Sequence, residues 1–268
     1  MSKSFNALDR NFKEWGDFFH KNGYIVLNNA INSTEINKLC VDLDNVENRI
    51  KFKKNGHFVH KCFFENSKTT VDLIESSVLI DFAQYLIEDV PGGRGNSLFA
   101  HLIHNNAFIV PPNGRGQAPV WHTDDPLQQI IIQNNGKLPD YIKLPVLLAT
   151  WMIWLSDCLT PENGPTYVVP GSHRFGTIID INKANQFGIP TCGPAGTAVL
   201  INNQLWHRGC FNSSALPRKT LQLTFGRRII GHKFKSIMNY NLPQHVLQNK
   251  NDEVLHKRFG FLQGGAYS

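Results

Sequence analysis

Two histidines and one aspartate have the types and the spacing of a metal site. His122 and Asp124 form an H-x-D motif, and His207 follows the apolar run Thr197–Asn202. Residues i and i+2 of a β-strand point to the same face, so His122 and Asp124 can bind one ion, with His207 supplied by another strand. Two imidazoles and one carboxylate leave three open positions on an octahedral ion. That is the ligand set of non-haem Fe(II) oxygenases, whereas a structural zinc site needs four ligands.

An arginine close to the second histidine adds weight to this pattern. The H-x-D motif alone means little, because eleven histidines and twenty-one acidic residues give about one such motif by chance. Arg218, however, follows His207 by eleven residues, after a polar turn, and starts the next predicted strand. A guanidinium group binds a carboxylate through two parallel hydrogen bonds. A dicarboxylate co-substrate that binds the metal at one end needs such a partner at its other end.

The elements that must position these residues change character along the chain. Helical periodicity covers residues 8–22, 32–50 and 71–89, with a strand at 24–27. Residues 97–232 are short apolar runs separated by Gly, Pro and Asn turns, as in a sandwich, jelly roll or barrel. The runs are Leu98–Val110, Pro119–His122, Pro145–Leu155, Thr166–Val169, Thr197–Asn202 and Thr220–Arg227.

We therefore predict a single domain over residues 1–268 that is mainly β within the α+β class. Residues 1–96 form a mainly helical cap with the first strands, residues 97–232 form the β core, and residues 233–268 form a basic C-terminal segment. The chain is 41% hydrophobic and 18% charged, which excludes a disordered protein.

Cysteine usage and hydropathy indicate the compartment. The five cysteines are an odd number, are widely spaced and contain no C-x-x-C motif, which favours a reducing compartment over a disulfide-rich secreted fold. The N-terminus has no apolar signal segment, and the longest apolar stretch, Leu144–Leu155, is too short to span a bilayer. We expect a soluble, cytoplasmic protein without a membrane span.

The net charge of +6 is concentrated near the C-terminus. Residues 218–258 contain nine Lys and Arg against two acidic residues. Such a segment fits a plain basic surface, an anionic small molecule, a membrane surface or nucleic acid.

Taken together, these features resemble the phytanoyl-CoA dioxygenase family of Fe(II)/2-oxoglutarate-dependent oxygenases. The resemblance is carried by Pro111–Gly114, Trp121–Asp124, Asn163–Pro165, Pro170–His173, and His207 with Arg218. It implies a double-stranded β-helix, which is a cupin-like jelly roll, with N-terminal and flanking helices. It also implies Fe(II), 2-oxoglutarate and O2 as cofactor and co-substrates.

The resemblance also assigns roles to individual residues. It makes His122, Asp124 and His207 the iron ligands and catalytic centre, and it pairs Arg218 with the distal carboxylate of 2-oxoglutarate. It also implies two more cofactor-binding positions, Asn106 on the strand before the Pro-Pro turn, and Trp151. Gly209 departs from the pattern, because phytanoyl-type enzymes have there a serine that touches 2-oxoglutarate.

The expected reaction is hydroxylation of a small molecule with release of succinate and CO2. Asp124 is present where halogenating relatives have a small residue, so halogenation is not expected. Alternatives are desaturation, epimerisation or cyclisation with the same cofactors, and a non-catalytic cupin-like binding module. Nucleic-acid demethylation is a minor variant, because after the triad the basic segment fits an anionic small molecule better. The substrate's identity and the oligomeric state stay open.

The remaining polar residues receive weaker predictions. Candidates for the substrate pocket are Arg115, Asp125, Gln128, Gln129 and Arg208. His101 and His104 have odd spacing on one strand, so only one of them can line the pocket. His57 and His60 are predicted at the surface and His173 in a structural turn. The predicted core thiols are Cys158, Cys192 and Cys210.

Overall fold

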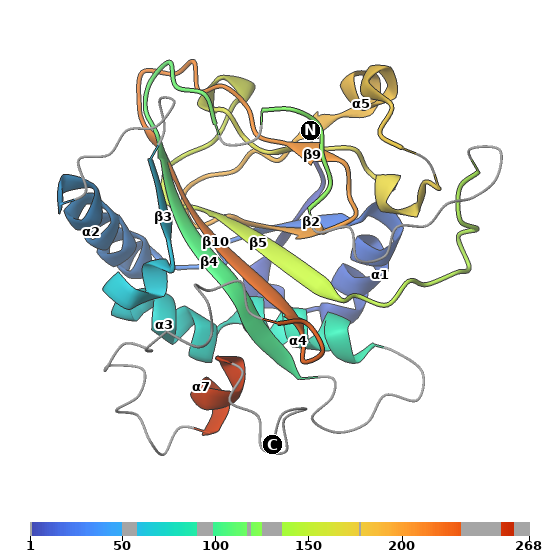
Figure 1. The fold of residues 1–268 in the computed structure, drawn as a ribbon, viewed down its shortest axis with the longest axis horizontal. Coiled ribbons are helices and arrows are strands. Elements are labelled where there is room, and N and C mark those ends of the chain that lie inside the picture. Colours follow the sequence, from blue (N-terminus) through green and yellow to red (C-terminus); the bar gives the residue numbers. More distant parts are fainter. Residues whose placement is uncertain are drawn as a thin grey trace.

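The computed structural model describes residues 2–49, 58–89, 99–116, 119–124, 136–176, 178–231 and 253–259 (Figure 1). Two β-sheets form its centre. The larger sheet has the strand order β1-β2-β8-β5-β10-β4-β3, and its pairings are antiparallel except for β1 with β2. Its strands are β1 (Ser4–Asn6), β2 (Tyr24–Asn28), β3 (Phe58–Lys61), β4 (Ala100–Val110), β5 (Leu148–Trp154), β8 (Ala198–Asn202) and β10 (Arg218–Arg227). The smaller sheet has the order β7-β6-β9, from β6 (Tyr167–Val168), β7 (Ile189–Pro190) and β9 (His207–Arg208).

The helices lie mainly in the N-terminal third. They are α1 (Phe12–Asn22), α2 (Ser33–Arg49), α3 (Lys68–Glu75), α4 (Val78–Glu88), α5 (Ile181–Phe187) and α7 (Glu253–Arg258), with 3-10 turns at Ala7–Asp9, Phe63–Asn66, Pro161–Asn163 and Ser172–Arg174. Within the described residues, no helix is long and apolar enough to cross a membrane.

The helix predicted over residues 71–89 is in fact two helices. Ser76 and Ser77 are extended between α3 and α4, and the Ser77 side chain accepts a hydrogen bond from the Ile80 backbone N–H. A serine at this position satisfies one of the free N–H groups at a helix start, so it favours a new helix over a continuous one. The predicted strand over 119–122 is also shorter, because only His122 pairs, in an isolated bridge with His207.

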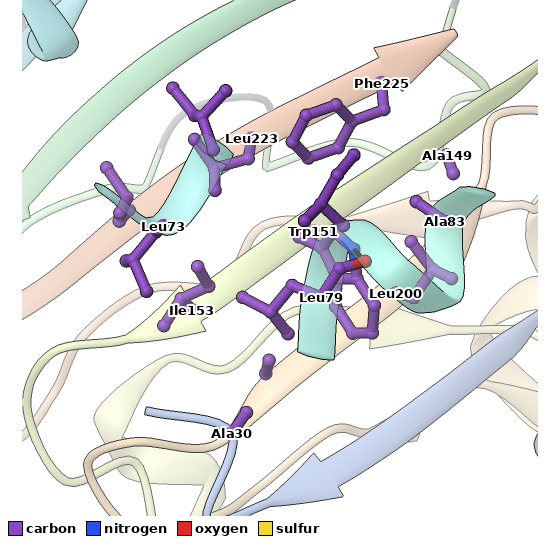
Figure 2. Packing of buried hydrophobic residues seen from close by; sticks show 14 of the residues in the cluster. Ala30, Leu73, Leu79, Ala83, Ala149, Trp151, Ile153, Leu200, Leu223 and Phe225 are labelled. Atoms are coloured by element: carbon purple, nitrogen blue, oxygen red, sulfur yellow. Dashed lines mark hydrogen bonds between the residues drawn. The ribbon is translucent and has the colours of Figure 1, made fainter. Parts of the chain in front are cut away.

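The main hydrophobic core fills the space between the helices and one face of the larger sheet (Figure 2). On β10, Leu221, Leu223 and Phe225 are fully buried in this core. Each such side chain contributes about 1.5–3 kcal/mol through burial. Strand alternation sends the residues between them to the opposite face of the sheet. The helical layer thus fixes which face of β10 is left for polar side chains.

Several cations of the basic segment are engaged in the fold. Lys219 pairs with Asp44, and Arg227 donates to the carbonyl oxygens of Val146 and Ile87. Arg258 donates to the side chain of Gln84 and to the carbonyl oxygen of Ala100. Apart from 253–259, the predicted C-terminal segment 233–268 lies outside the described residues.

Candidate metal centre

The three predicted metal ligands lie together. Asp124 Oδ1 is 3.5 Å from His122 Nε2, and Asp124 Oδ2 is 3.6 Å from His207 Nε2. One ligand atom of each residue lies within 4.8 Å of the other two. Residues 85 positions apart in sequence are thus close enough to share one ion.

Backbone pairing explains this proximity. The N–H of His122 donates to the carbonyl oxygen of His207 at 2.9 Å, and the N–H of His207 donates to His122 at 3.0 Å. The two residues are therefore directly opposite each other, and their ring centroids are 4.2 Å apart. On its other side, His207 pairs with Val168 of β6. His207 is thus paired on both sides, with Val168 of the smaller sheet and with His122, and this pairing places the two histidines next to each other.

Both imidazoles are oriented for metal binding. His122 Nδ1 lies 2.8 Å from the carbonyl oxygen of Val120, and His207 Nδ1 lies 2.8 Å from that of Leu205. A carbonyl oxygen can only accept a hydrogen bond, so each Nδ1 carries the proton. Each Nε2 then faces Asp124, and once it carries no proton its lone pair is free to bind a metal ion, as metal-binding histidines require. The donor set and its tautomers fit a divalent metal ion.

The carboxylate of this group is held in its charged form. Burial alone raises the pKa of Asp124, but the hydrogen bonds and charges of His122 and His207 bring that pKa well below its usual range. The same hydrogen bond to Asp124 raises the pKa of His122. Asp124 is therefore an anionic ligand at neutral pH.

A cavity of about 330 Å³ opens at the triad. A small molecule fits in such a volume. One wall belongs to the larger sheet, and the other carries the triad. The cavity is lined by His104, Asn106, Phe108, His122, Asp124, Met152, Thr166, Ile201, His207, Gly209, Arg218, Thr220 and Gln222.

Arg218 lies in this cavity as a buried cation. The residue is 7% exposed, its Nε has no hydrogen-bond partner, and burial lowers its pKa. In the part of the chain that the structure describes, no carboxylate forms an ion pair with it. A buried unpaired charge is costly, so this guanidinium suits an anionic ligand. Gly116 makes room for it, because a Cβ there would lie 3.2 Å from Arg218 Nη2 and 2.8 Å from the Cys210 carbonyl oxygen.

Asn106 lines the same cavity and has a fixed side chain. Its Nδ2 donates to Gln222 Oε1 at 2.8 Å and is 3.3 Å from His104 Nδ1. His104 lines the cavity, whereas His101 does not and instead has its Nε2 2.7 Å from the Ile230 carbonyl oxygen. This outcome agrees with the prediction that only one of the two histidines can face the pocket.

The cofactor-binding role predicted for Trp151 is wrong. Trp151 is fully buried in the core on the helical side of the sheet, and its Nε1 donates to the Leu79 carbonyl oxygen at 3.0 Å (Figure 2). Its neighbour Met152 lines the cavity instead. The predicted register was off by one residue, because an unbroken apolar run shows no alternation. The strand pairing shows which residue faces the cavity. Met152 lies opposite Gln222, and Gln222 is on the same face of β10 as Arg218.

The two other arginines that were predicted in the substrate pocket do not line the cavity. Arg115 is exposed and outside the cavity lining, and Arg208 lies on the other side of β9 from His207, a predicted metal ligand. His173 is buried, with its Nε2 3.0 Å from the His20 carbonyl oxygen, which agrees with a structural role. The remaining candidates, Asp125, Gln128, Gln129 and His57, lie outside the described residues. Pocket residues that the sequence analysis missed are Phe108, Met152, Thr166, Ile201, Thr220 and Gln222.

The cysteines carry no sign of a metal site. All five are free, and only Cys158 is fully buried, while Cys192 and Cys210 are half-buried. Burial raises the pKa of Cys158 to about 12, so this thiol stays protonated. The prediction of core thiols holds for Cys158 and is too strong for the other two.

Comparisons with known proteins agree with this geometry. Residues 19–220 match the family model described as phytanoyl-CoA dioxygenase (PhyH). The ectoine dioxygenase of Sphingopyxis alaskensis is 23% identical over 243 residues, which cover 77% of this chain and 73% of the relative.

Solved structures show the same fold. EctD from S. alaskensis with 2-oxoglutarate and 5-hydroxyectoine has a TM-score of 0.61 at 20% identity, over 81% of this chain and 76% of that one. The non-heme alpha ketoglutarate dependent epimerase SnoN from nogalamycin biosynthesis has a TM-score of 0.60 at 14% identity, over 81% and 83%. The predicted fold class, a cupin-like β core with flanking helices, is confirmed.

Proposed function

Since the chain belongs to the phytanoyl-CoA dioxygenase family, we propose that it hydroxylates a small molecule with Fe(II), 2-oxoglutarate and O2 and releases succinate and CO2. Membership confirms the family resemblance of the sequence and the class of 2-oxoglutarate-dependent non-haem iron dioxygenases. One observation carries the proposal: a two-histidine, one-carboxylate group and an unpaired buried arginine line the same cavity.

In this proposal, His122, Asp124 and His207 hold the iron. Their three donors leave room on an octahedral ion for a co-substrate and O2. The bound metal supplies the activation of O2, for which decarboxylation of 2-oxoglutarate provides electrons. The chain's part is to keep Asp124 ionised and both Nε2 atoms unprotonated. The carbonyl oxygens of Val120 and Leu205 do this for the histidines.

Arg218 and Asn106 are the proposed co-substrate residues. The guanidinium of Arg218 would bind the distal carboxylate of 2-oxoglutarate, which removes the cost of a buried unpaired charge. Asn106 would contact the co-substrate with an amide whose orientation is set by Gln222. Where the family has a serine, Gly209 lines the cavity without a hydroxyl group. Phe108, Met152 and Ile201 supply the apolar part of the cavity wall.

Hydroxylation is the proposed outcome because Asp124 fills the carboxylate position. A second outcome, epimerisation, is kept for one reason: the structural neighbour SnoN is described as an epimerase. Product mass separates the two. A hydroxylated product is heavier by one oxygen atom, whereas an epimer has the mass of the substrate.

The rest of the proposal concerns context. We treat residues 1–268 as one catalytic domain in the cytoplasm, supported by the pairing of β2 with β8 and by five free cysteines. The substrate is a small molecule. The described basic residues Lys219, Arg227 and Arg258 are bonded within the fold, so they lend no support to an anionic substrate.

The test is a substrate screen with purified protein, Fe(II), 2-oxoglutarate and O2, followed by succinate release and product mass. We expect substrate-dependent succinate and a product with one added oxygen atom, and we expect Asp124→Ala to lose both. Arg115→Ala is the control, because Arg115 is exposed and outside the cavity lining. Full activity of Asp124→Ala would overturn the ligand assignment.

A further inference from the structure

An arginine is stacked against two aromatic rings on the outer side of the smaller sheet. The Cζ atom of Arg208 lies 4.9 Å from the ring centroid of Trp121 and 5.3 Å from that of Tyr167. These distances are within the range of cation–π attraction. Tyr167 is the cross-strand partner of Arg208. The stack therefore joins β6, β9 and the segment that contains Trp121.

The stack lies directly behind the candidate metal ligands. Trp121 precedes His122, and Arg208 follows His207. Strand alternation turns the two histidines toward the cavity and their neighbours to the opposite face. The side-chain contact between Arg208 and Trp121 thus connects the same two backbone segments as the contact between the ligands.

The segment with His122 needs such support. Within residues 119–124, its β pairing is the single bridge between His122 and His207. Trp121 attaches this segment to α5 and the residue after it. Its Nε1 donates to Asn185 Oδ1 at 2.8 Å, and its ring lies so close to Gly188 that a Cβ there would be 2.5 Å from it. The residue after α5 must therefore be small for the indole to fit. Trp121 is the anchor of this segment, and Arg208 ties that anchor to β9.

We propose that Arg208 is a positioning residue that holds Trp121 against β9 and so sets the distance between the metal-binding histidines. The inference rests on the proposed metal site and adds a residue that touches neither metal nor substrate. Its consequence is a contribution to metal affinity. Two partly buried cation–π contacts are worth about 1.4 kcal/mol together. If they act only by keeping the histidines at the binding distance, their loss weakens metal binding by at most this amount, which is about tenfold in the dissociation constant.

The experiment measures the dissociation constant for Ni(II), a probe without redox turnover, by titration of the metal-free protein. Arg208→Met keeps an unbranched, apolar stem, although a shorter one, and removes the cation. We expect it to bind Ni(II) about tenfold more weakly than the unchanged protein. Arg208→Lys, which keeps a cation, should recover part of the affinity. Arg115→Met is the matched control at an exposed arginine and should bind like the unchanged protein.

A double-mutant cycle separates positioning from general stabilisation. If Arg208 acts through Trp121, the effects of Arg208→Met and Trp121→Leu on Ni(II) affinity are not additive. Additive effects overturn the inference. So does an Arg208→Met variant whose metal-free thermal midpoint falls while its Ni(II) affinity stays unchanged, because that is a purely structural role. If Arg208→Met does not fold, Arg208→Lys is put through the same cycle.

The same titration distinguishes failure of the inference from failure of the proposed function. If the unchanged protein does not bind Ni(II) or Fe(II), the metal site itself is wrong. If it binds and Arg208→Met binds equally well, the metal site stands and the role of Arg208 is refuted.

Discussion

Replacing Arg218 by methionine should have opposite effects on co-substrate binding and on folding. Arg218 is 7% exposed, and its Nε has no hydrogen-bond partner. The methionine side chain keeps an unbranched apolar stem without the charge. It occupies the part of the wall next to the backbone, so the substitution changes the charge more than the packing.

The magnitude of each effect follows from the burial of this charge. Removal of one partner of a buried, hydrogen-bonded charge pair costs about 2–5 kcal/mol of binding. Taking about 3 kcal/mol, we expect the affinity for 2-oxoglutarate to fall by roughly 150-fold. Without the co-substrate, the buried guanidinium lacks an anionic partner among the described residues. Its removal should therefore leave the free energy of unfolding unchanged or raise it.

Two assays on the same samples test this prediction. Titration of the metal-loaded protein with 2-oxoglutarate in the absence of O2 gives the dissociation constant, and urea unfolding of the free protein gives its stability. Arg227→Met is the matched control on the same strand. It should lose about 1 kcal/mol of stability through its bonds to Val146 and Ile87 while keeping its affinity for 2-oxoglutarate. Unchanged affinity in Arg218→Met would refute the assignment of this residue.

Three further predictions follow from single contacts. Gly116→Ala should destabilise the protein by about 1–3 kcal/mol and weaken 2-oxoglutarate binding. The reason is that the added Cβ would lie 2.8 Å from the Cys210 carbonyl oxygen. Normal urea unfolding together with normal affinity would contradict this. Trp151→Phe should cost about 1–3 kcal/mol, because it removes the hydrogen bond to the Leu79 carbonyl oxygen and shrinks a fully buried side chain. It should leave 2-oxoglutarate affinity unchanged, whereas a loss of affinity alone would restore its predicted cofactor role. Burial lowers the pKa of His173 from 6.5 to about 4, so the folded state binds fewer protons than the unfolded state between these two pH values. The free energy of unfolding should therefore fall as the pH drops from 6.5 toward 4. The loss is about 2–3 kcal/mol by pH 4.5; unfolding curves for His173→Gln should show a flatter pH dependence, and an equally steep one would exclude this histidine as the cause.

Local patterns in the sequence predicted most of the helices and strands and the group of candidate metal ligands. The spacing of His122 and Asp124 follows from strand geometry and does not depend on the rest of the fold. The helix predicted from residue 32 and found from Ser33, and the strand at 24–27, also depend on neighbouring residues. Such features are encoded within a few positions of the chain, which is why the sequence could predict them.

Features that depend on contacts between distant segments could not be predicted in the same way. Trp151 and Met152 lie in one apolar run, and only the pairing of β5 with β10 decides which of them faces the cavity. The amide of Asn106 is fixed by Gln222, which is 116 residues away. The break between α3 and α4 is different, because it has a local cause: the Ser77 side chain caps the first turn of α4.

The most direct test of the central assignment is an anaerobic titration of the metal-free protein with Fe(II), for the unchanged chain and for Asp124→Ala. The assignment predicts one tightly bound iron per chain, and a visible absorption band that forms only when both iron and 2-oxoglutarate are present. It also predicts that Asp124→Ala loses tight iron binding and this band. Equal iron affinity in the two proteins would contradict the proposal that His122, Asp124 and His207 hold the metal.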